Sequence, residues 1–338
     1  MKKVTIVILN WNGVNHLKHY LPQVVEHSNC ELCKIVVADN GSTDESCGYV
    51  REHFPEVELW EFDQNYGFAG GYNRAIERVE TPYTLLLNSD AAPKAGWIEP
   101  LIEMAEFDLS IAAIMPKILS DRQPEMFEYA GAAGGYIDSL GYPFCRGRIM
   151  STVEKDCGQY DTPCRVFWAT GAALFVRTDL YRAVGGLDAD FFAHMEEIDL
   201  CWRLQLVGYQ VWVNPLSTVY HLGGGTLNEG SPRKTMLNHR NNLAMLYKNL
   251  KGSQRNFIIF VRMMLDGVTG LMYLVQRKNE HFKSVIEAHR QFRAMIPSLK
   301  IKRQQIQSAR KVAPVGVFRG SIILRYIFGG KIFPKNIG

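Results

Sequence analysis

The sequence predicts an α/β fold, with a mostly parallel central sheet flanked by helices and a helical, basic C-terminal extension. Short apolar runs alternate with amphipathic stretches in the first half of the chain, which is typical of a parallel sheet covered by helices. The charge also divides: residues 1–230 carry 17 Lys and Arg against 31 Asp and Glu, whereas residues 231–338 carry 21 against 3. We therefore expect an α/β domain over residues 1–250 and a separate basic region over 251–338.

Apolar runs and turn residues define the elements of the first ninety residues. We expect strands over 4–9, 34–39, 57–62 and 83–91, and a helix over 16–27. Ser42 followed by Glu45 predicts a capping box, so a second helix is expected to start at Ser42. The Gly-rich stretch 65–73 is expected to be a loop that leads into a third helix.

The second half begins with an irregular segment, residues 116–165, whose glycines and aromatic residues suggest a loop-rich insertion or a lid. Regular patterning then returns. It predicts a strand over 172–177, a short helix that stops at Gly185 and Gly186, a helix over 191–204, strands over 209–213 and 217–222, a turn at 223–226, and mainly helices from 231.

The cysteines and the N-terminus bear on the cellular compartment. Seven scattered cysteines in a chain of 338 residues suit free thiols in a reducing environment, and we interpret the spacing of Cys30 and Cys33 as incidental. The first residues resemble a signal peptide, but the apolar run 4–9 is too short and polar residues interrupt it. We interpret that run as a buried strand and expect a cytoplasmic protein.

The basic region contains an apolar stretch, 257–275, that is long enough to span a bilayer. Arg262 and Asp266 interrupt it and share one helical face with Thr269 and Gly270, so an amphipathic helix on a membrane or on the protein is favoured over a span. A second apolar run, 315–328, also carries arginines. The excess of positive charge favours an anionic membrane surface as partner and not nucleic acid, although helices packed on the domain with solvated basic faces are the alternative.

Polar residues gather where the predicted strands end, and ligands of parallel sheets bind beyond that edge. Asp90 could offer oxygen to a hard cation or could cap the strand. Asp39 could contact a ribose or a base, or could form an Asx turn. The glycines of 65–73 suit either a phosphate loop or a tight helix entry. His221, at the end of another strand, is a candidate ligand for a Mn²⁺-like ion, although a lone His is more often structural.

Three carboxylates lie within the stretch FFAHMEEIDLCWRL, residues 191–204. Glu196 and Asp199 share a helical face with Arg203, and Asp199 with Arg203 forms a plausible i,i+4 pair. Glu197 points about 100° away from Glu196 and has no charged partner one turn later. It is therefore the best candidate for a general base.

The chain resembles family 2 glycosyltransferases, in particular the rhamnosyltransferase-like branch of bacterial polysaccharide synthesis. The motifs that carry the resemblance, over about residues 3–250, are VILNWNG, VVADNGSTDES, NYGFAGGYNRAI, LLLNSDAAP, FWATGAALFVRTDLYRAVGGLD, FFAHMEEIDLCWRL and VYHLGGGT. The resemblance implies a GT-A fold. It also implies that a sugar moves from a nucleotide-diphospho-sugar, such as a dTDP- or UDP-linked one, with inversion at the anomeric carbon.

Residue roles follow from the resemblance. Glu197 takes the position of the catalytic base, which is usually Asp in the family, and Asp90 with His221 would hold Mg²⁺ or Mn²⁺. Asn88 replaces the first Asp of the family's DxD-like motif. The nucleotide-sugar would contact Asn10, Asn12, Asp39, Asn65, Gly67, Asn73, Asn88 and Asp90; Trp168 and Gly171 would line the acceptor side; Glu196 and Asp199 would be supporting acids.

The processive synthases' QxxRW motif is absent, which favours addition of a single sugar. We expect a hexosyl- or rhamnosyltransferase that acts on a hydroxyl of a lipid-linked glycan in cell-surface polysaccharide synthesis, at the inner face of the cytoplasmic membrane. Two alternatives stay open. One is transfer to polyprenyl phosphate, which needs no base because the acceptor is already anionic. The other is a non-catalytic protein that binds a nucleotide-sugar or a glycan.

Overall fold

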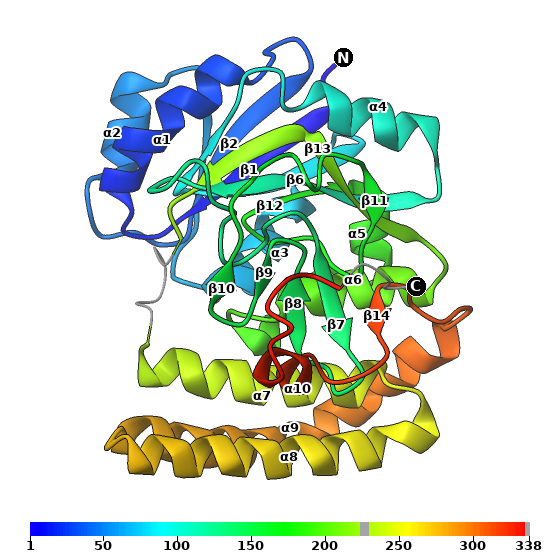
Figure 1. Ribbon diagram of the computed structural model, residues 1–338. Coiled ribbons are helices and arrows are strands. Elements are labelled where there is room, and N and C mark those ends of the chain that lie inside the picture. Colours follow the sequence, from blue (N-terminus) through cyan, green and yellow to red (C-terminus); the bar gives the residue numbers. More distant parts are fainter. Residues whose placement is uncertain (224–229, 335–338) are drawn as a thin grey trace.

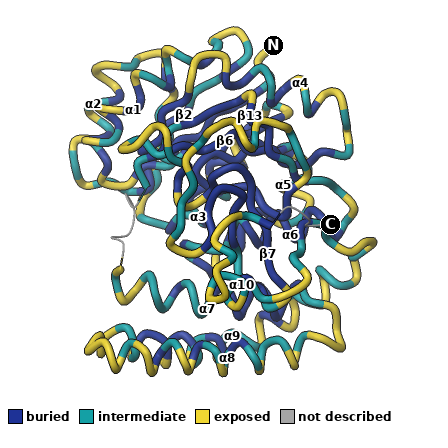
Figure 2. Tube along the Cα trace, viewed as in Figure 1, coloured by how far each residue is buried: buried dark blue, intermediate teal, exposed yellow. Residues whose placement is uncertain are grey.

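A mixed β-sheet of nine strands runs through the middle of the computed structural model, which describes residues 1–223 and 230–334. The strand order is β11-β13-β6-β12-β4-β1-β2-β3, and β5 pairs with β13 beside this path. Helices cover both faces, and three long C-terminal helices lie below the sheet in the view of Figure 1. Buried residues concentrate in and around the sheet (Figure 2). The α/β fold predicted from the sequence is confirmed.

One half of this sheet is parallel, as the sequence predicts. Its strands are β1 (Val4–Asn10), β2 (Cys33–Asp39), β3 (Glu58–Glu61) and β4 (Tyr83–Asn88). They alternate with the helices α1 (Val14–His27), α2 (Ser46–His53) and α3 (Gly67–Glu77). Asn10 pairs with Asp39 and Leu9 with Asn88 in register, so polar residues end three adjacent strands at one edge.

The other half is mixed, because β12 (Ala173–Arg177) runs antiparallel between β4 and β6 (Ile111–Ser120). The strands predicted over 209–213 and 217–222 are one strand, β13 (Gln210–His221), with an irregular register between Asn214 and Thr218. The remaining elements are β5 (Ala91–Pro93), β11 (Cys164–Arg165), α4 (Glu99–Phe107) and α5 (Thr178–Ala183). The turn predicted at 223–226 lies, beyond Gly223, outside the described residues.

The helix predicted to start at Ser42 begins instead at Ser46, and the capping box does not form. The Ser42 hydroxyl accepts hydrogen bonds from the backbone N–H of Asn12 and from the side chain of Asn10, so it is not available to cap a helix. The prediction was wrong because the turn after β2 is held by contacts to the neighbouring strand end, which local sequence does not reveal.

The segment 116–165 is more regular than the predicted insertion or lid. After β6 it forms most of a second, five-stranded sheet in the order β10-β9-β8-β7-β14. These strands are β7 (Gly135–Asp138), β8 (Pro143–Cys145), β9 (Arg148–Ile149), β10 (Thr152–Val153) and β14 (Val317–Phe318). Since β14 pairs with β7, the C-terminal region returns to the α/β domain.

Helices form most of the chain from residue 189 onward. They are the short η1 (Ala189–Phe191), α6 (Glu196–Leu206), α7 (Pro232–Asn249), α8 (Gly252–Val275), α9 (Asn279–Ala309) and α10 (Ile322–Ile327). The helix α7 lies between the sheet domain and the α8–α9 pair (Figure 1). The face of α8 predicted from Arg262, Asp266 and Gly270 is the one that is buried.

Candidate active site

Three polar side chains meet at the edge where β1, β2 and β4 end. The Nδ2 of Asn10 donates to the Asp39 carboxylate over 3.0 Å, and both residues are buried. The other Asp39 oxygen accepts from the backbone N–H of Ser42 over 2.8 Å. Asp39 therefore shapes the turn after β2, and the structure brings it together with Asn10 and Asn12 as the sequence predicted.

Asn12 lies in the same turn with a left-handed backbone (φ +50°). Its side-chain oxygen accepts from the backbone N–H of Thr43 over 2.7 Å. The Oδ1 of Asn10 is buried and has no hydrogen-bond partner among the described residues. Hydrogen bonds within the cluster thus fix its side chains, and the Oδ1 of Asn10 can still accept a hydrogen bond from a ligand.

The loop predicted to approach a phosphate is fixed by Asn40. The Asn40 amide donates to Asn65 Oδ1 over 3.0 Å and to the Gly67 carbonyl, and it accepts from the N–H of Tyr66. A Cβ on Gly67 would lie 2.5 Å from the ring of Phe192, and its φ of +72° also requires glycine. The sequence suggested two roles for these glycines; the packing of Gly67 supports the tight entry to α3, and a contact of Gly67 with a ligand stays a prediction.

Asn73 lies on α3, and its side chain contacts Tyr181 and Leu187. Its amide donates to the Leu187 carbonyl, and its oxygen accepts from Tyr181 Oη and from the Leu187 N–H. These contacts give the Asn73 side chain a structural role, and the nucleotide contact expected for Asn73 stays a prediction.

Asp90 and His221 meet because β13 pairs with β5 immediately after Asp90. Their Oδ1 and Nε2 atoms are 3.1 Å apart and both residues are buried. Asn88 Nδ2 lies 3.2 Å from the same imidazole nitrogen. Burial would raise the pKa of Asp90, but His221 outweighs it and holds the pKa below its usual value. Burial lowers the pKa of His221, whereas Asp90 and then Glu128 raise it to about 10.

This pair offers two ligand atoms that suit a divalent cation, a carboxylate oxygen and an imidazole nitrogen. Among residues 1–223 and 230–334, no group of three or more His, Cys, Asp or Glu side chains is arranged to hold a metal ion. Two protein donors would leave positions for phosphate oxygens and water, as is common for Mg²⁺. The residues present therefore fit a cation that is shared with a diphosphate.

Glu128 is a residue of this site that sequence reasoning missed. Its Oε1 lies 3.5 Å from Nδ1 of His221, on the opposite side of the ring from Asp90, and Glu128 is buried. Its Oε2 accepts from the backbone N–H of Ala130. Glu128 follows β6 in the segment expected to be a lid, 93 positions before His221, so no local pattern marks it.

Glu196 and Glu197 form the first turn of α6, and both have a buried oxygen with no partner among the described residues. Burial raises the pKa of Glu197 to about 7. Burial and then the charge of Glu197 raise the pKa of Glu196 well above its usual value. A carboxylate with a pKa near neutrality is suited to general-base catalysis. Gly171 lies beside Glu197, since a Cβ on Gly171 would be 3.8 Å from that of Glu197.

Trp168, expected on the acceptor side, is buried, and its indole N–H donates to the Tyr136 carbonyl over 2.9 Å. Its ring packs so closely on Gly135 that a Cβ there would lie 2.1 Å from it. Trp168 therefore packs against β7 of the second sheet. Gly171 is the member of this predicted pair that adjoins the candidate base.

Asp199 belongs to a buried ionic network. It accepts from Arg203 over 2.8 Å, which confirms the predicted i,i+4 pair, from Lys248 over 3.0 Å and from Asn249 over 2.7 Å. Lys248 also pairs with Asp188. The network joins α6 to the end of α7, so Asp199 fixes the position of the helix that carries Glu197.

A strained loop precedes Glu196. Phe192, His194 and Met195 all have positive φ values, between +64° and +73°, which non-glycine residues rarely adopt. Asn241 on α7 spans the loop, and its Nδ2 lies 2.8–3.0 Å from the carbonyl oxygens of Phe191, Ala193 and His194. The conformation persists because α7 holds it, a relationship that the sequence did not indicate.

A sequence profile described as Glycosyl transferase family 2 matches residues 5–130. The chain is 26% identical over 227 residues to the pre-mycofactocin glycosyltransferase of Mycobacterium tuberculosis, covering 65% of this chain and 43% of that protein. It is 25% identical over 240 residues to the N-acetylglucosaminyl-diphospho-decaprenol L-rhamnosyltransferase of the same organism, covering 65% of this chain and 76% of that one. The chain thus spans less than half the length of the first relative.

The fold is similar to that of a mannosyltransferase from Pyrobaculum calidifontis, solved in complex with GDP-Man and Mn²⁺. The TM-score is 0.53 at 14% identity, and the match covers 91% of this chain and 84% of that one. This likeness concerns the fold alone, which is the predicted GT-A architecture.

Proposed function

We propose that the chain, whose residues 5–130 match the profile of glycosyl transferase family 2, transfers a sugar from a nucleotide-diphospho-sugar to an acceptor hydroxyl, with inversion at the anomeric carbon. The observation that carries this proposal is the coexistence of two features. One is the Asp90–His221 pair at the strand ends. The other is Glu197 at the start of α6, a half-buried residue with one buried carboxylate oxygen that has no hydrogen-bond partner among the described residues.

The strand-end cluster is the proposed donor site. Asn10, Asn12 and Asp39 would receive the nucleoside, in the place where ligands of such sheets bind. Asp90 and His221 would hold Mg²⁺ or Mn²⁺ together with the diphosphate. When bound, such a cation offsets the negative charge that develops on the departing nucleoside diphosphate.

Glu197 is the proposed base. As the acceptor oxygen attacks the anomeric carbon from the face opposite the diphosphate, Glu197 takes its proton. The raised pKa makes this carboxylate a stronger proton acceptor than an exposed Glu, while it is still partly ionised near neutral pH. This favours a hydroxyl acceptor over polyprenyl phosphate, which has no proton that needs removal.

The acceptor class is proposed from the rhamnosyltransferase relative, whose name states that its acceptor is an N-acetylglucosaminyl-diphospho-decaprenol. We propose a lipid-linked glycan of cell-surface polysaccharide synthesis as acceptor, and a hexose or rhamnose as the transferred sugar. Such an acceptor is reached at the cytoplasmic face of the membrane.

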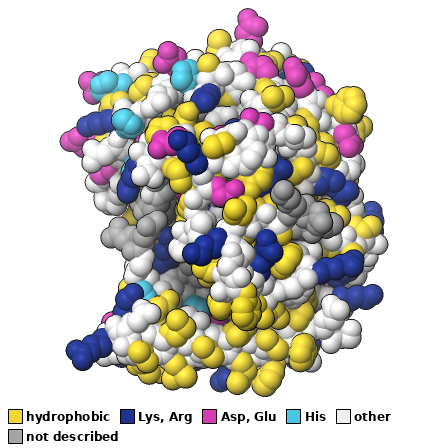
Figure 3. Space-filling view, viewed as in Figure 1, with side chains coloured by type: hydrophobic (Ala, Val, Ile, Leu, Met, Phe, Trp, Pro, Cys, Tyr) yellow, Lys and Arg dark blue, Asp and Glu magenta, His cyan; other side chains and the backbone are white. Residues whose placement is uncertain are grey.

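The exposed face of α8 supports a peripheral membrane location. Apolar side chains recur every three or four residues along it, and each is more than half exposed: Phe257, Phe260, Met264, Val268, Leu271 and Val275. We name these six the α8 stripe. Figure 3 shows hydrophobic side chains gathered along the lower edge of the molecule, with acidic side chains concentrated toward the upper part. An apolar stripe on a basic region is suited to an anionic bilayer surface.

The helix α8 is long and apolar enough to cross a bilayer. Its opposite face, however, is tied into the protein. Asp266 lies 2.9 Å from His239 on α7 and 3.1 Å from His289 on α9. Insertion across a membrane would break these buried contacts, so we propose that α8 lies in the interface and does not span the bilayer.

The enzymatic proposal is tested with a panel of dTDP-, UDP- and GDP-sugars, with and without Mn²⁺ or Mg²⁺, by measuring release of the nucleoside diphosphate. Cation-dependent turnover of one donor that is lost in Asp90→Asn supports it. Tight binding of a nucleotide-sugar with no turnover under any of these conditions, with a lipid-linked acceptor present, would instead identify a binding protein.

The membrane proposal is tested by flotation with anionic liposomes. Phe257→Ser with Leu271→Ser should abolish flotation because it removes apolar area from the stripe. The matched control is Phe107→Ser with Leu109→Ser, a pair that is at least as exposed but lies at the end of α4. Equal flotation of the two double variants would reject the proposed location.

A further inference from the structure

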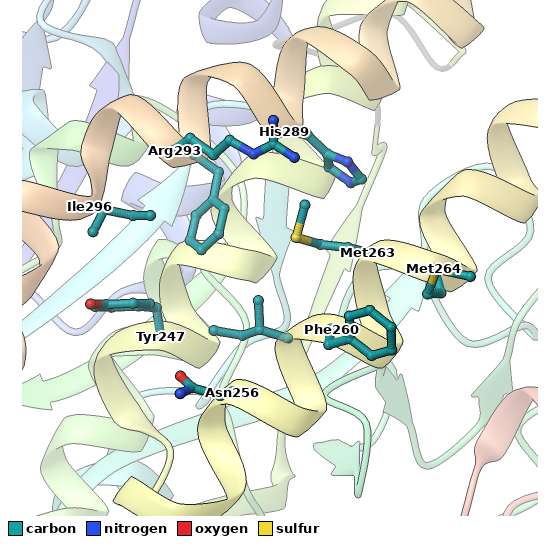
Figure 4. Close-up of a pocket in the computed structure, with 10 residues that line it drawn as sticks. Tyr247, Asn256, Phe260, Met263, Met264, His289, Arg293 and Ile296 are labelled. Carbon is teal, nitrogen blue, oxygen red and sulfur yellow. The ribbon is translucent and has the colours of Figure 1, made fainter.

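A groove lies between α8 and α9, next to the α8 stripe, and it has no role in the proposed chemistry. Its volume is about 630 Å³. Six apolar side chains line most of it: Ile259, Phe260, Met263, Met264, Phe292 and Ile296. Figure 4 shows residues of α7, α8 and α9 surrounding the space, with His289 and Arg293 on its α9 side. Because Phe260 and Met264 also belong to the stripe, the groove adjoins the surface proposed to contact lipid.

A second, polar hollow of about 410 Å³ is lined by residues of the same two helices. It is lined by Gly252, Lys300, Arg303, Gln304 and Gln307. Arg293, Ile296, Lys300 and Arg303 follow one another at three- or four-residue spacing, so they share one face of α9. In the described part of the chain, neither hollow is lined by an Asp or a Glu. The apolar groove thus has Arg293 on its α9 side, and Lys300 and Arg303 lie further along the same face of α9.

We propose that this groove binds an anionic phospholipid of the bilayer, with an acyl chain against Ile259 and Phe292 and the phosphate near Arg293 and Lys300. Burial of the chain removes apolar surface from water, and an arginine at the rim can donate two hydrogen bonds to a phosphate. The inference rests on the proposed membrane location of α8 and extends it from a general surface to a defined lipid site.

Position and charge favour this occupant over two others. The helix α7 lies between the groove and α6, so a lipid-linked acceptor seated here would be separated from Glu197 by a helix (Figure 1). In a symmetric dimer through this groove, a second copy of the chain would bring its own basic C-terminal region against Arg293 and Lys300, which like-charge repulsion disfavours. A phosphate removes that repulsion.

The proposal is tested by native mass spectrometry of the full chain, released from vesicles of phosphatidylglycerol or of phosphatidylcholine with the same acyl chains. We expect one retained phosphatidylglycerol and no retained phosphatidylcholine. Arg293→Glu should lower the retained fraction about tenfold, as expected when a charge-assisted contact is lost. Arg290→Glu is the matched control, since it makes the same charge change one turn earlier at a position that lines neither hollow.

Two results would overturn the lipid site: equal retention by both variants, or retention of phosphatidylcholine. Dimer masses that vanish in Arg293→Glu would show that a second copy covers the groove. Flotation with liposomes distinguishes failure of the lipid site from failure of the membrane proposal. A chain that floats with anionic liposomes but retains no lipid contradicts the lipid site alone. If Arg293→Glu does not fold, Ile259→Trp fills the groove and should give the same loss of lipid.

Discussion

The side-chain nitrogen of Asn241 lies 2.8 Å from the carbonyl oxygen of His194, two residues before the first turn of α6. Asn241 also contacts the carbonyl oxygens of Phe191 and Ala193. Through these three contacts, the helix α7 holds the strained loop that leads to Glu197. Asn241 does not touch the reacting groups in this arrangement. We propose that it positions Glu197, the candidate base.

Replacement of Asn241 by Leu should lower kcat by at least about tenfold while donor KM changes little, because the strained loop would relax and displace Glu197. Asn242→Leu is the matched control. Asn242 is the next residue of α7, is also buried, and donates to the carbonyl of Gly141 over 2.8 Å, away from the loop. Steady-state kinetics and thermal melts of both variants check this. Equal losses of kcat would show that the effect of Asn241 is general destabilisation.

Glu128 should set the affinity for the cation by orienting His221. Loss of a carboxylate that orients a ligating histidine typically weakens metal binding by about 10–100-fold, and we expect that change for Glu128→Gln. The affinity is measured from the signal of free Mn²⁺ in electron paramagnetic resonance, with a nucleoside diphosphate present. Glu125→Gln, on the exposed part of the same segment, should bind Mn²⁺ like the unaltered chain. Unchanged Mn²⁺ affinity in Glu128→Gln would contradict the role of Glu128.

The pH dependence of kcat/KM should report the ionisation of Glu197. A base must be deprotonated, and burial raises its pKa to about 7. Activity should therefore be nearly constant above that pH and fall about tenfold for each unit below it. A profile with its acidic limb near the ordinary pKa of Glu, about 4.3, would mean that this carboxylate is not the base.

Much of the proposed donor side could be predicted from the sequence, because β1, β2 and β4 are mainly apolar runs that each end in a polar residue. Asn10, Asp39 and Asn88 therefore came together as expected. The buried face of α8 was predictable too, since Arg262, Asp266 and Gly270 share one helical face and the rest is apolar.

Long-range contacts account for what the sequence did not predict. Ser42 has the local pattern of a helix cap, yet its hydroxyl binds the turn after the neighbouring strand β1. Glu128 reaches His221 only because β6 and β13 pair in parallel, and their 93-residue separation leaves no local signal. The roles of Asn241 and Lys248 likewise follow from contacts that form only because α7 packs near α6.

Removal of Lys248 should destabilise the fold strongly. Its ammonium is buried between Asp188 and Asp199, and a buried ion pair that loses one partner typically costs about 3–5 kcal/mol. We expect Lys248→Met to show a loss of this size in urea unfolding. Lys283→Met breaks an exposed pair with Glu280 and should cost at most about 1 kcal/mol. Similar stabilities of the two variants would show that the buried network contributes little.

The most direct test of the central claim compares donor binding and turnover in Glu197→Gln, which keeps the shape of the side chain and removes its basicity. We expect the Kd for the nucleotide-sugar to stay within about twofold and turnover to fall by roughly 10²–10⁴, the usual contribution of a general base. Turnover of Glu197→Gln close to that of the unaltered chain would contradict the assignment of this carboxylate as the catalytic base.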